Sequence, residues 1–232
     1  MECVILSKTR MTGNIICVGA MLTNGRMLRL LKRNGYNQDH DTNYNIGDVW
    51  DIDFINKRAI RHPHVEDVLV QRGTYLNRRI EDLSQYIQNR PNVQIWNGSP
   101  DNLFDGLLEW TNGGSGYISE NGEVPQCSVG FWISNRDLKC KSFHGIRFEY
   151  PNQGYGWRSL KYVGVEENVP DSISEGTLLR VSLARWWTGS EGGQEERCYL
   201  QLSGWYESLG NLGTPPSRND YIPPPTEEDI PY

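Results

Sequence analysis

The chain has 232 residues, 37% hydrophobic and 11% aromatic, enough for one large or two small domains with a core. Its net charge of −6 argues against a uniformly basic nucleic-acid-binding surface. Because no charged segment precedes an apolar one at the start, and no apolar run nears the roughly 18 residues of a membrane span, we expect a cytoplasmic protein.

Residues 1–73 contain five short stretches with β-strand composition: ECVILSKTR, NIICVGAML, RMLRLLKR, YNIGDVWDIDFI and HVEDVLVQR. In the fourth stretch, apolar residues alternate with aspartates, the period of a half-buried strand. The alternating residues are Trp50, Ile52 and Phe54, with Asp51 and Asp53 between them. Five short strands in this length predict a small barrel of the oligonucleotide/oligosaccharide-binding (OB) type.

A helical connector is predicted over residues 74–112. Apolar residues recur on one helical face before Pro91, at Leu76, Ile80, Leu83 and Ile87. A second helix is expected after Ser99, which can cap it, and Pro100, which suits its first turn.

Strand patterns resume over residues 113–213, where we expect a second OB-like barrel. Its two strongest strands, LLRVSLARWW and CYLQLSGWY, each have an aliphatic face and a face of polar, basic and aromatic residues. Residues 214–232 are rich in proline and hold four acidic residues and one basic residue, which predicts a disordered acidic tail. The predicted fold class is therefore mainly β, with two barrels, a helical connector and a flexible tail.

The polar face of those two strands is a candidate surface for single-stranded nucleic acid. Bases stack on exposed aromatic rings for ~1–3 kcal/mol each, and Arg neutralises phosphates. The candidate residues are Arg180, Trp186, Tyr199 and Trp205. The alternative is that the tryptophans belong to the core, as most do; Arg180, being charged, is expected to be exposed.

The first unit adds two basic clusters that could follow a phosphate backbone. The candidate residues are Arg26, Arg29, Lys32 and Arg33 in one cluster, and Arg58 and Arg61 in the other. The alternative is an ordinary solvated surface, and Asp51 and Asp53 argue against nucleic acid on their face of the fourth strand.

Catalytic and metal-binding patterns are missing from the sequence. It has no phosphate-binding Walker loop, no G-x-S-x-G, no H-E-x-x-H and no C-x-x-C. Cys127, Cys140 and His144 match no familiar metal-site spacing. The five cysteines are scattered and odd in number, which favours reduced thiols. We expect a protein that is not an enzyme and has no cofactor.

The last six residues, EEDIPY, resemble the C-terminal tip of bacterial single-stranded-DNA-binding proteins, an acidic run followed by Ile-Pro-Phe. Tyr232 departs from the Phe of that family. The resemblance implies a tip that docks on helicases or nucleases, with a basic residue and an apolar pocket receiving the terminal carboxylate and ring. The partner-binding residues implied are Glu227, Glu228, Asp229, Ile230, Pro231 and Tyr232.

The body resembles the prokaryotic dual-OB-domain family over most of residues 1–206, on segments such as GDVWDIDF and LLRVSLARWW. That resemblance implies two OB barrels and a nucleic-acid role, often near mobile-element or phage-defence genes. We therefore expect a protein that binds single-stranded DNA, or RNA, and recruits a DNA-processing enzyme in repair or replication. The alternatives are an adaptor that binds protein and a sensor of a small ligand or nucleotide.

Overall fold

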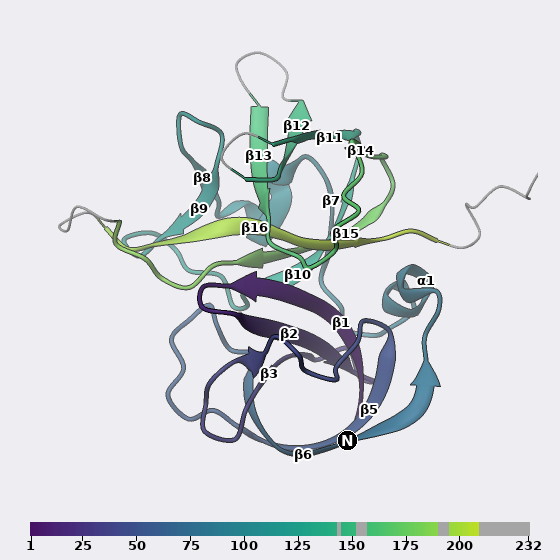
Figure 1. Ribbon diagram of the computed structural model, residues 1–232. Helices are drawn as coiled ribbons and strands as arrows, with labels where there is room; N and C mark the ends of the chain where they lie inside the picture. Colours follow the sequence, from purple (N-terminus) through teal and green to yellow (C-terminus); the bar gives the residue numbers. More distant parts are fainter. Residues whose placement is uncertain (143–144, 152–156, 190–194, 209–232) are drawn as a thin grey trace, which may run out of the picture.

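The computed structural model describes residues 1–142, 145–151, 157–189 and 195–208. It is mainly β and consists of two units that lie against each other, the first below the second in Figure 1. Within these ranges, neither helical element is long and apolar enough to cross a membrane. All five cysteines are free.

The first unit is a closed five-stranded barrel. Its hydrogen-bonded order is β1-β2-β3-β6-β5 and back to β1, with β3 and β6 parallel and all other neighbours antiparallel. The strands are β1 (Glu2–Met11), β2 (Ile15–Leu22), β3 (Met27–Leu31), β5 (Asp48–Asn56) and β6 (Asp67–Arg79), with the short β4 (Gln38–Asp39) beside β2. The predicted first barrel is confirmed.

The expected alternation in β5 is also present. Ile52 is fully buried, and Trp50 and Phe54 pack against the same core, while Asp51 and Asp53 are exposed. The period of two therefore assigned the two faces of this strand correctly.

The predicted connector contains a helical element in each expected segment, but both elements are shorter than predicted. Strand β6 continues to Arg79, because its second half pairs with β5, as in the Trp50–Tyr75 register. Only α1 (Leu83–Gln88) is helical in the first predicted segment, and it is followed by β7 (Ile95–Gly98). The second predicted helix is the short 3-10 element η1 (Pro100–Gly106), where Ser99 Oγ accepts a hydrogen bond from the Asp101 amide at 3.2 Å. Pairing with a neighbouring strand outweighed local helical periodicity.

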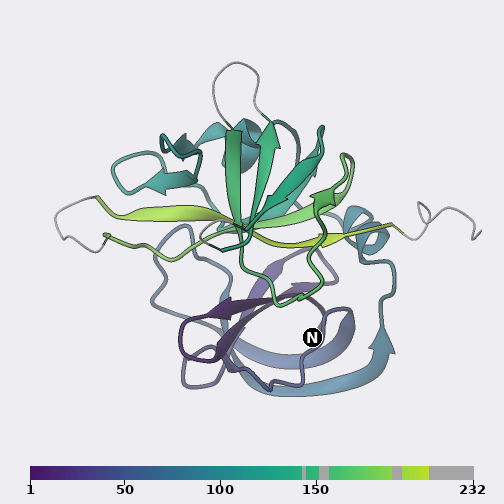
Figure 2. The same ribbon diagram turned by 45° about the horizontal axis from the view of Figure 1, so that its top comes forward.

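The second unit contains most of the remaining strands. These are β8 (Glu109–Trp110), β9 (Gly116–Ser119), β10 (Val129–Ser134), β11 (Leu138–Lys141), β12 (Arg147–Pro151), β13 (Trp157–Tyr162), β14 (Ser172–Ile173), β15 (Leu178–Leu183) and β16 (Arg197–Tyr206). Their sheet runs β14-β11-β12-β13-β16-β15-β10-β7. When β10 and β11 are counted as two halves of one strand, this order repeats that of the first barrel, with β13 and β16 as its parallel pair. Figure 2 shows this unit above the first barrel.

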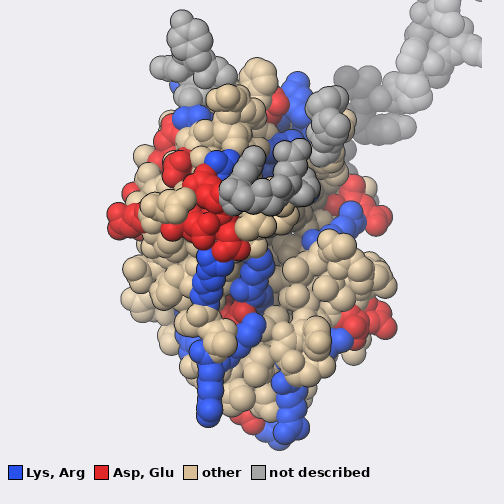
Figure 3. All heavy atoms as spheres, turned by 90° about the vertical axis from the view of Figure 1, so that its left-hand side faces the viewer, with Lys and Arg blue, Asp and Glu red and all other residues tan. Residues whose placement is uncertain are grey.

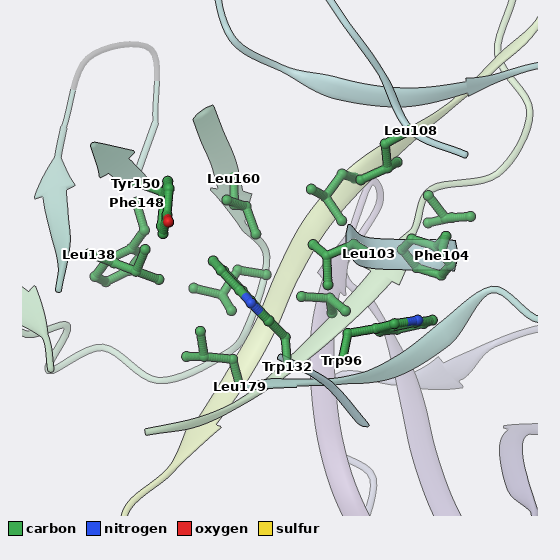
Figure 4. Close-up of a cluster of buried hydrophobic side chains, with 14 of the residues drawn as sticks. Trp96, Leu103, Phe104, Leu108, Trp132, Leu138, Phe148, Tyr150, Leu160 and Leu179 are labelled. Atoms are coloured by element: carbon green, nitrogen blue, oxygen red, sulfur yellow. The ribbon is translucent and has the colours of Figure 1, made fainter. Parts of the chain in front are cut away.

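The second barrel encloses a large aromatic core. Trp132 is fully buried at its centre, with Leu138, Phe148 and Leu160 on the side of β11 to β13 (Figure 4). Trp96 of β7 lies beside Phe104, with ring centroids 4.7 Å apart. The connector therefore closes the end of this barrel and is part of its core.

The two barrels share an apolar interface. Side chains on the outer faces of β1 and β2 pack with α1 and with the outer faces of β10, β15 and β16, through Val4, Leu6, Met21, Leu83, Ile87, Phe131, Leu178 and Tyr206. Tyr206 Oη donates to the Leu6 carbonyl at 2.7 Å. Because the interface is buried and apolar, the two barrels are expected to move as one body.

Candidate functional site

A cavity of about 370 Å³ lies between the two barrels, and we call it the inter-barrel cleft. On the first barrel it is lined by the end of β1 and the outer faces of β2 and β3, including Arg10, Cys17, Gly19 and Arg29. Strands 2 and 3 of an OB barrel are where such barrels bind oligonucleotides. The opposite wall comes from β13, β15, β16 and the segment just after β15 in the second barrel, including Lys161, Arg180, Ser182, Arg185 and Gln201.

The lining of the cleft is strongly cationic. It contains five basic residues, Arg10, Arg29, Lys161, Arg180 and Arg185, and one acidic residue, Glu66. The end of β1 and the end of β15 lie on the left in Figure 1, and Figure 3 shows Lys and Arg side chains gathered across the middle of that face, below an acidic group. A protein of net negative charge thus has a local positive site, which favours an anionic ligand.

Arg180 is the most unusual of these residues. It projects from the outer face of β15 and is only 4% exposed. In the described part of the chain, no hydrogen bond or ion pair holds its guanidinium, and its Nε is buried without a partner. Burial lowers the pKa of Arg180 from its ordinary value, which reflects the cost of placing a charge there.

Gly19 makes room for this guanidinium from the other barrel. A β-carbon at position 19 would lie 2.6 Å from Nη2 of Arg180 and 2.5 Å from Oγ of Ser7. Both distances are shorter than real β-carbon contacts, so any larger side chain at position 19 would force the Arg180 guanidinium and the Ser7 hydroxyl to move.

The other buried charges beside the cleft are paired. The Asp67 carboxylate lies 2.6 Å from Arg185 Nη2, 3.2 Å from Arg29 Nη1 and 3.5 Å from Lys57 Nζ. Burial alone would raise the pKa of Asp67, but these three cations outweigh it and lower the pKa below its usual value.

Glu66 is also occupied, because its carboxylate accepts hydrogen bonds from the amide and Oγ of Ser128, both at 2.7 Å. This carboxylate joins the first barrel to the start of the second. It forms no ion pair within the described residues, although its negative charge acts on Arg180 and Arg29 from a distance. Arg180 therefore has no direct counter-ion in the described chain.

Two expectations about the second barrel are corrected. Arg180 was expected to be exposed, but the first barrel covers the face from which it projects. Trp205 was placed on the same face as Tyr199, but it packs in the barrel core, 5.4 Å from the Tyr162 ring and 6.0 Å from the Phe148 ring. The β15–β16 register shifts between Arg180 and Val181, and this bulge moves Trp205 to the opposite face.

Trp186 and Arg61 contact each other across the two units. The Arg61 guanidinium lies 4.6 Å from the Trp186 ring centroid, and Trp186 Nε1 donates to the His62 carbonyl at 2.7 Å. Arg61 also pairs with Glu120 at 3.4 Å. These two candidate residues hold the barrels together, and Arg61 covers a face of the ring that a base would need.

Tyr199 belongs to an aromatic group at the outer end of β16. Its ring centroid lies 5.9 Å from that of Tyr117 and 6.1 Å from that of Trp187. Trp187 is 54% exposed. The structure thus separates Tyr199 from Arg180 and gives it a different exposed neighbour, Trp187, which the sequence reasoning did not select.

The four residues of the first basic cluster, Arg26, Arg29, Lys32 and Arg33, do not share one site in the structure. Arg29 lines the cleft, Lys32 pairs with Asp39 at 2.6 Å, and Arg26 donates to Asn56 at 2.7 Å. Arg33, from the same cluster, and Arg58, from the other, are exposed, and neither forms an ion pair within the described residues. Of this cluster, the structure brings Arg29 alone to the inter-barrel cleft.

Sequence reasoning missed Arg10, Lys161 and Arg185. Arg10 lies on β1, Lys161 on β13 and Arg185 just after β15, far apart along the chain, and no local motif marks them. His144 and the tip Glu227–Tyr232 lie outside the described residues. Among the residues described, no three His, Cys, Asp or Glu side chains are grouped as metal ligands.

A larger hollow, of about 980 Å³, lies on the outer side of the second barrel beside Trp157. Its lining contains three basic and three acidic residues, Arg136, Lys139 and Lys141 with Asp137, Glu149 and Glu175. Because these charges balance, the hollow lacks the anion preference of the inter-barrel cleft.

Comparison with known proteins agrees with this architecture. The model of a family described as dual OB-containing domain matches residues 1–205. No curated protein and no solved structure matches the chain.

Proposed function

Since the chain belongs to the dual OB-containing domain family, we propose that it binds single-stranded nucleic acid and that the inter-barrel cleft holds the phosphate backbone. The protein acts by binding, without a catalytic centre of its own. The observation that carries the proposal is the buried guanidinium of Arg180, which has no hydrogen-bonded partner in the described chain and lines a cleft with four other cations.

The position of the cleft supports this assignment. One wall is the outer face of β2 and β3, the face that OB barrels use for oligonucleotides. Arg10, with its side chain 54% exposed, and Arg185, 44% exposed, extend the basic lining toward solvent, although Arg10 lies 3.6 Å from Glu167 and Arg185 pairs with Asp67. A phosphate backbone could follow these residues, with Trp187 available for stacking a base outside the cleft.

Binding is tested by fluorescence anisotropy with single-stranded DNA, single-stranded RNA and duplex DNA at two salt concentrations. We expect single strands to bind more tightly than duplex, with an affinity that falls steeply as salt rises. Arg29→Gln should reduce the affinity, whereas Arg72→Gln, an exposed substitution on β6 away from the cleft, should not. Equal affinity in both variants would remove the cleft from the binding site.

We also propose that the tip Glu227–Tyr232 recruits a helicase or nuclease. The support is its resemblance to the tip of bacterial single-stranded-DNA-binding proteins. Pull-down from host lysate should lose the partner when residues 227–232 are deleted or when Tyr232 is changed to Ala, while Tyr232→Phe keeps it. Retention of the same partners by all variants would contradict the proposal.

A further inference from the structure

We infer that the inter-barrel cleft is a pocket for a phosphate monoester, such as the phosphorylated end of a nucleic-acid strand. This inference rests on the proposed function and specifies which part of the ligand the cleft receives. It depends on three features of the site: the lack of a bound partner for Arg180, the small volume of the cleft, and the difference in charge between a terminal and an internal phosphate.

The first feature is the unfilled hydrogen-bonding capacity of Arg180. A guanidinium offers five N–H donors and binds phosphate oxygens through two parallel hydrogen bonds. Arg180 is 96% buried, and its Nε finds no acceptor in the described residues. Leaving buried donors unsatisfied is costly, so the site is expected to be complete only when an anion supplies the acceptors.

The second feature is the size of the cleft. A volume of about 370 Å³ is near the lower end of the range for small-molecule sites, which runs from about 300 to 1,000 Å³. The cleft also lies between two barrels joined by a buried interface. An internal phosphodiester carries a nucleoside on each side into such a space, whereas a terminal phosphate carries one.

The third feature is charge. A phosphate monoester carries about −1.5 to −2 charges at pH 7, because its second pKa is about 6. An internal phosphodiester carries one negative charge. Of the five cations in the lining, Arg29 and Arg185 pair with Asp67, and Arg10 lies 3.6 Å from Glu167. Arg180 and Lys161 form no ion pair within the described residues, so a ligand with two negative charges matches them better than a ligand with one. The lack of a side chain at Gly19 leaves space for the Arg180 guanidinium that would bind this ligand.

The test compares single strands of one sequence that carry a 5′-phosphate, a 3′-phosphate or hydroxyl groups at both ends. We expect one phosphorylated strand to bind about tenfold more tightly than the hydroxyl strand, a difference typical of charge-assisted hydrogen bonds. Arg180→Gln and Gly19→Ala should each abolish the preference, and Arg72→Gln should keep it. A parallel thermal-shift experiment uses inorganic phosphate and a nucleoside monophosphate without any strand.

The outcomes separate this inference from the proposed function. If all three strands bind equally, the phosphate-end pocket is overturned while single-strand binding stands. If no strand binds but the nucleoside monophosphate raises the melting temperature in an Arg180-dependent way, the pocket stands and its ligand is a free nucleotide. If Arg180→Gln and Gly19→Ala change neither the end preference nor the thermal shift, the pocket is elsewhere and the inference fails.

Discussion

Arg180 of the second barrel lies against Gly19 of the first, so closely that a β-carbon at position 19 would be 2.6 Å from its Nη2 atom. A buried guanidinium therefore contacts a glycine, whose lack of a side chain leaves space for it. Because the two residues come from different barrels, the site exists only when the barrels are docked.

Gly19→Ala should move the Arg180 guanidinium without removing it. The colliding atoms are the ends of two side chains, Arg180 Nη2 and Ser7 Oγ, so the fold can adjust. We expect the affinity for single-stranded nucleic acid to fall about tenfold, with a small change in melting temperature. Gly204→Ala is the matched control, because no atom lies within 4 Å of its added β-carbon. Equal affinities in the two variants would contradict the prediction.

Arg180→Met should stabilise the fold while it weakens binding. Replacing buried charge by an apolar side chain of similar length often adds about 1–4 kcal/mol to the free energy of unfolding. Chemical denaturation measures this gain, and anisotropy measures the loss of binding. Arg72→Met is the exposed control and should change stability by less than ~0.5 kcal/mol. A destabilised Arg180→Met protein would mean that the guanidinium supports the interface and is not held there for a ligand.

Asp67→Asn should destabilise the docked barrels. The substitution keeps the shape of the side chain but leaves Arg29, Arg185 and Lys57 without their shared counter-charge. The expected loss is about 3 kcal/mol, at the lower end for a broken buried ion pair because Arg185 is partly exposed. Asp39→Asn, which breaks the exposed pair with Lys32, should cost less than ~1 kcal/mol in the same urea titration. Similar losses in the two variants would rule out a special role for Asp67.

His64 should make the fold sensitive to acid. Burial, with the nearby Arg29 and Arg185, lowers the pKa of His64 to about 3, although Asp67 acts in the opposite direction. The unfolded value is about 6.5. Between these values the unfolded chain binds one more proton, so the stabilisation is complete above about pH 6.5 and is lost as the pH falls toward 3.

The corresponding slope is about 1.4 kcal/mol per pH unit. It is measured by urea unfolding between pH 4.5 and 6.5, where His64→Gln should remove it. His40→Gln, at an exposed position, should leave the pH dependence as it is in the unmodified protein. An unchanged slope in His64→Gln would show that other groups cause the acid sensitivity.

The sequence by itself determined the elements whose evidence is local. The alternation in Trp50–Phe54 predicted which side chains of β5 face the core, because neighbouring residues of a strand point to opposite sides. Turn residues between short strands predicted small barrels. Local patterns failed where pairing at long range decided the outcome, as when β6 continued beyond residue 74 by pairing with β5.

Only the tertiary structure decided the candidate site. The alternation in β15 placed Arg180 on the outer face, but its burial depends on the first barrel, which docks on that face. No pattern in the sequence predicted the bulge in the β15–β16 pairing. That bulge places the Trp205 side chain against the barrel core. Arg10, Arg29, Lys161 and Arg185 reach one cleft because two barrels bring distant strands together. A strand's sequence specifies its two faces, whereas what covers each face depends on how separately folded surfaces fit together.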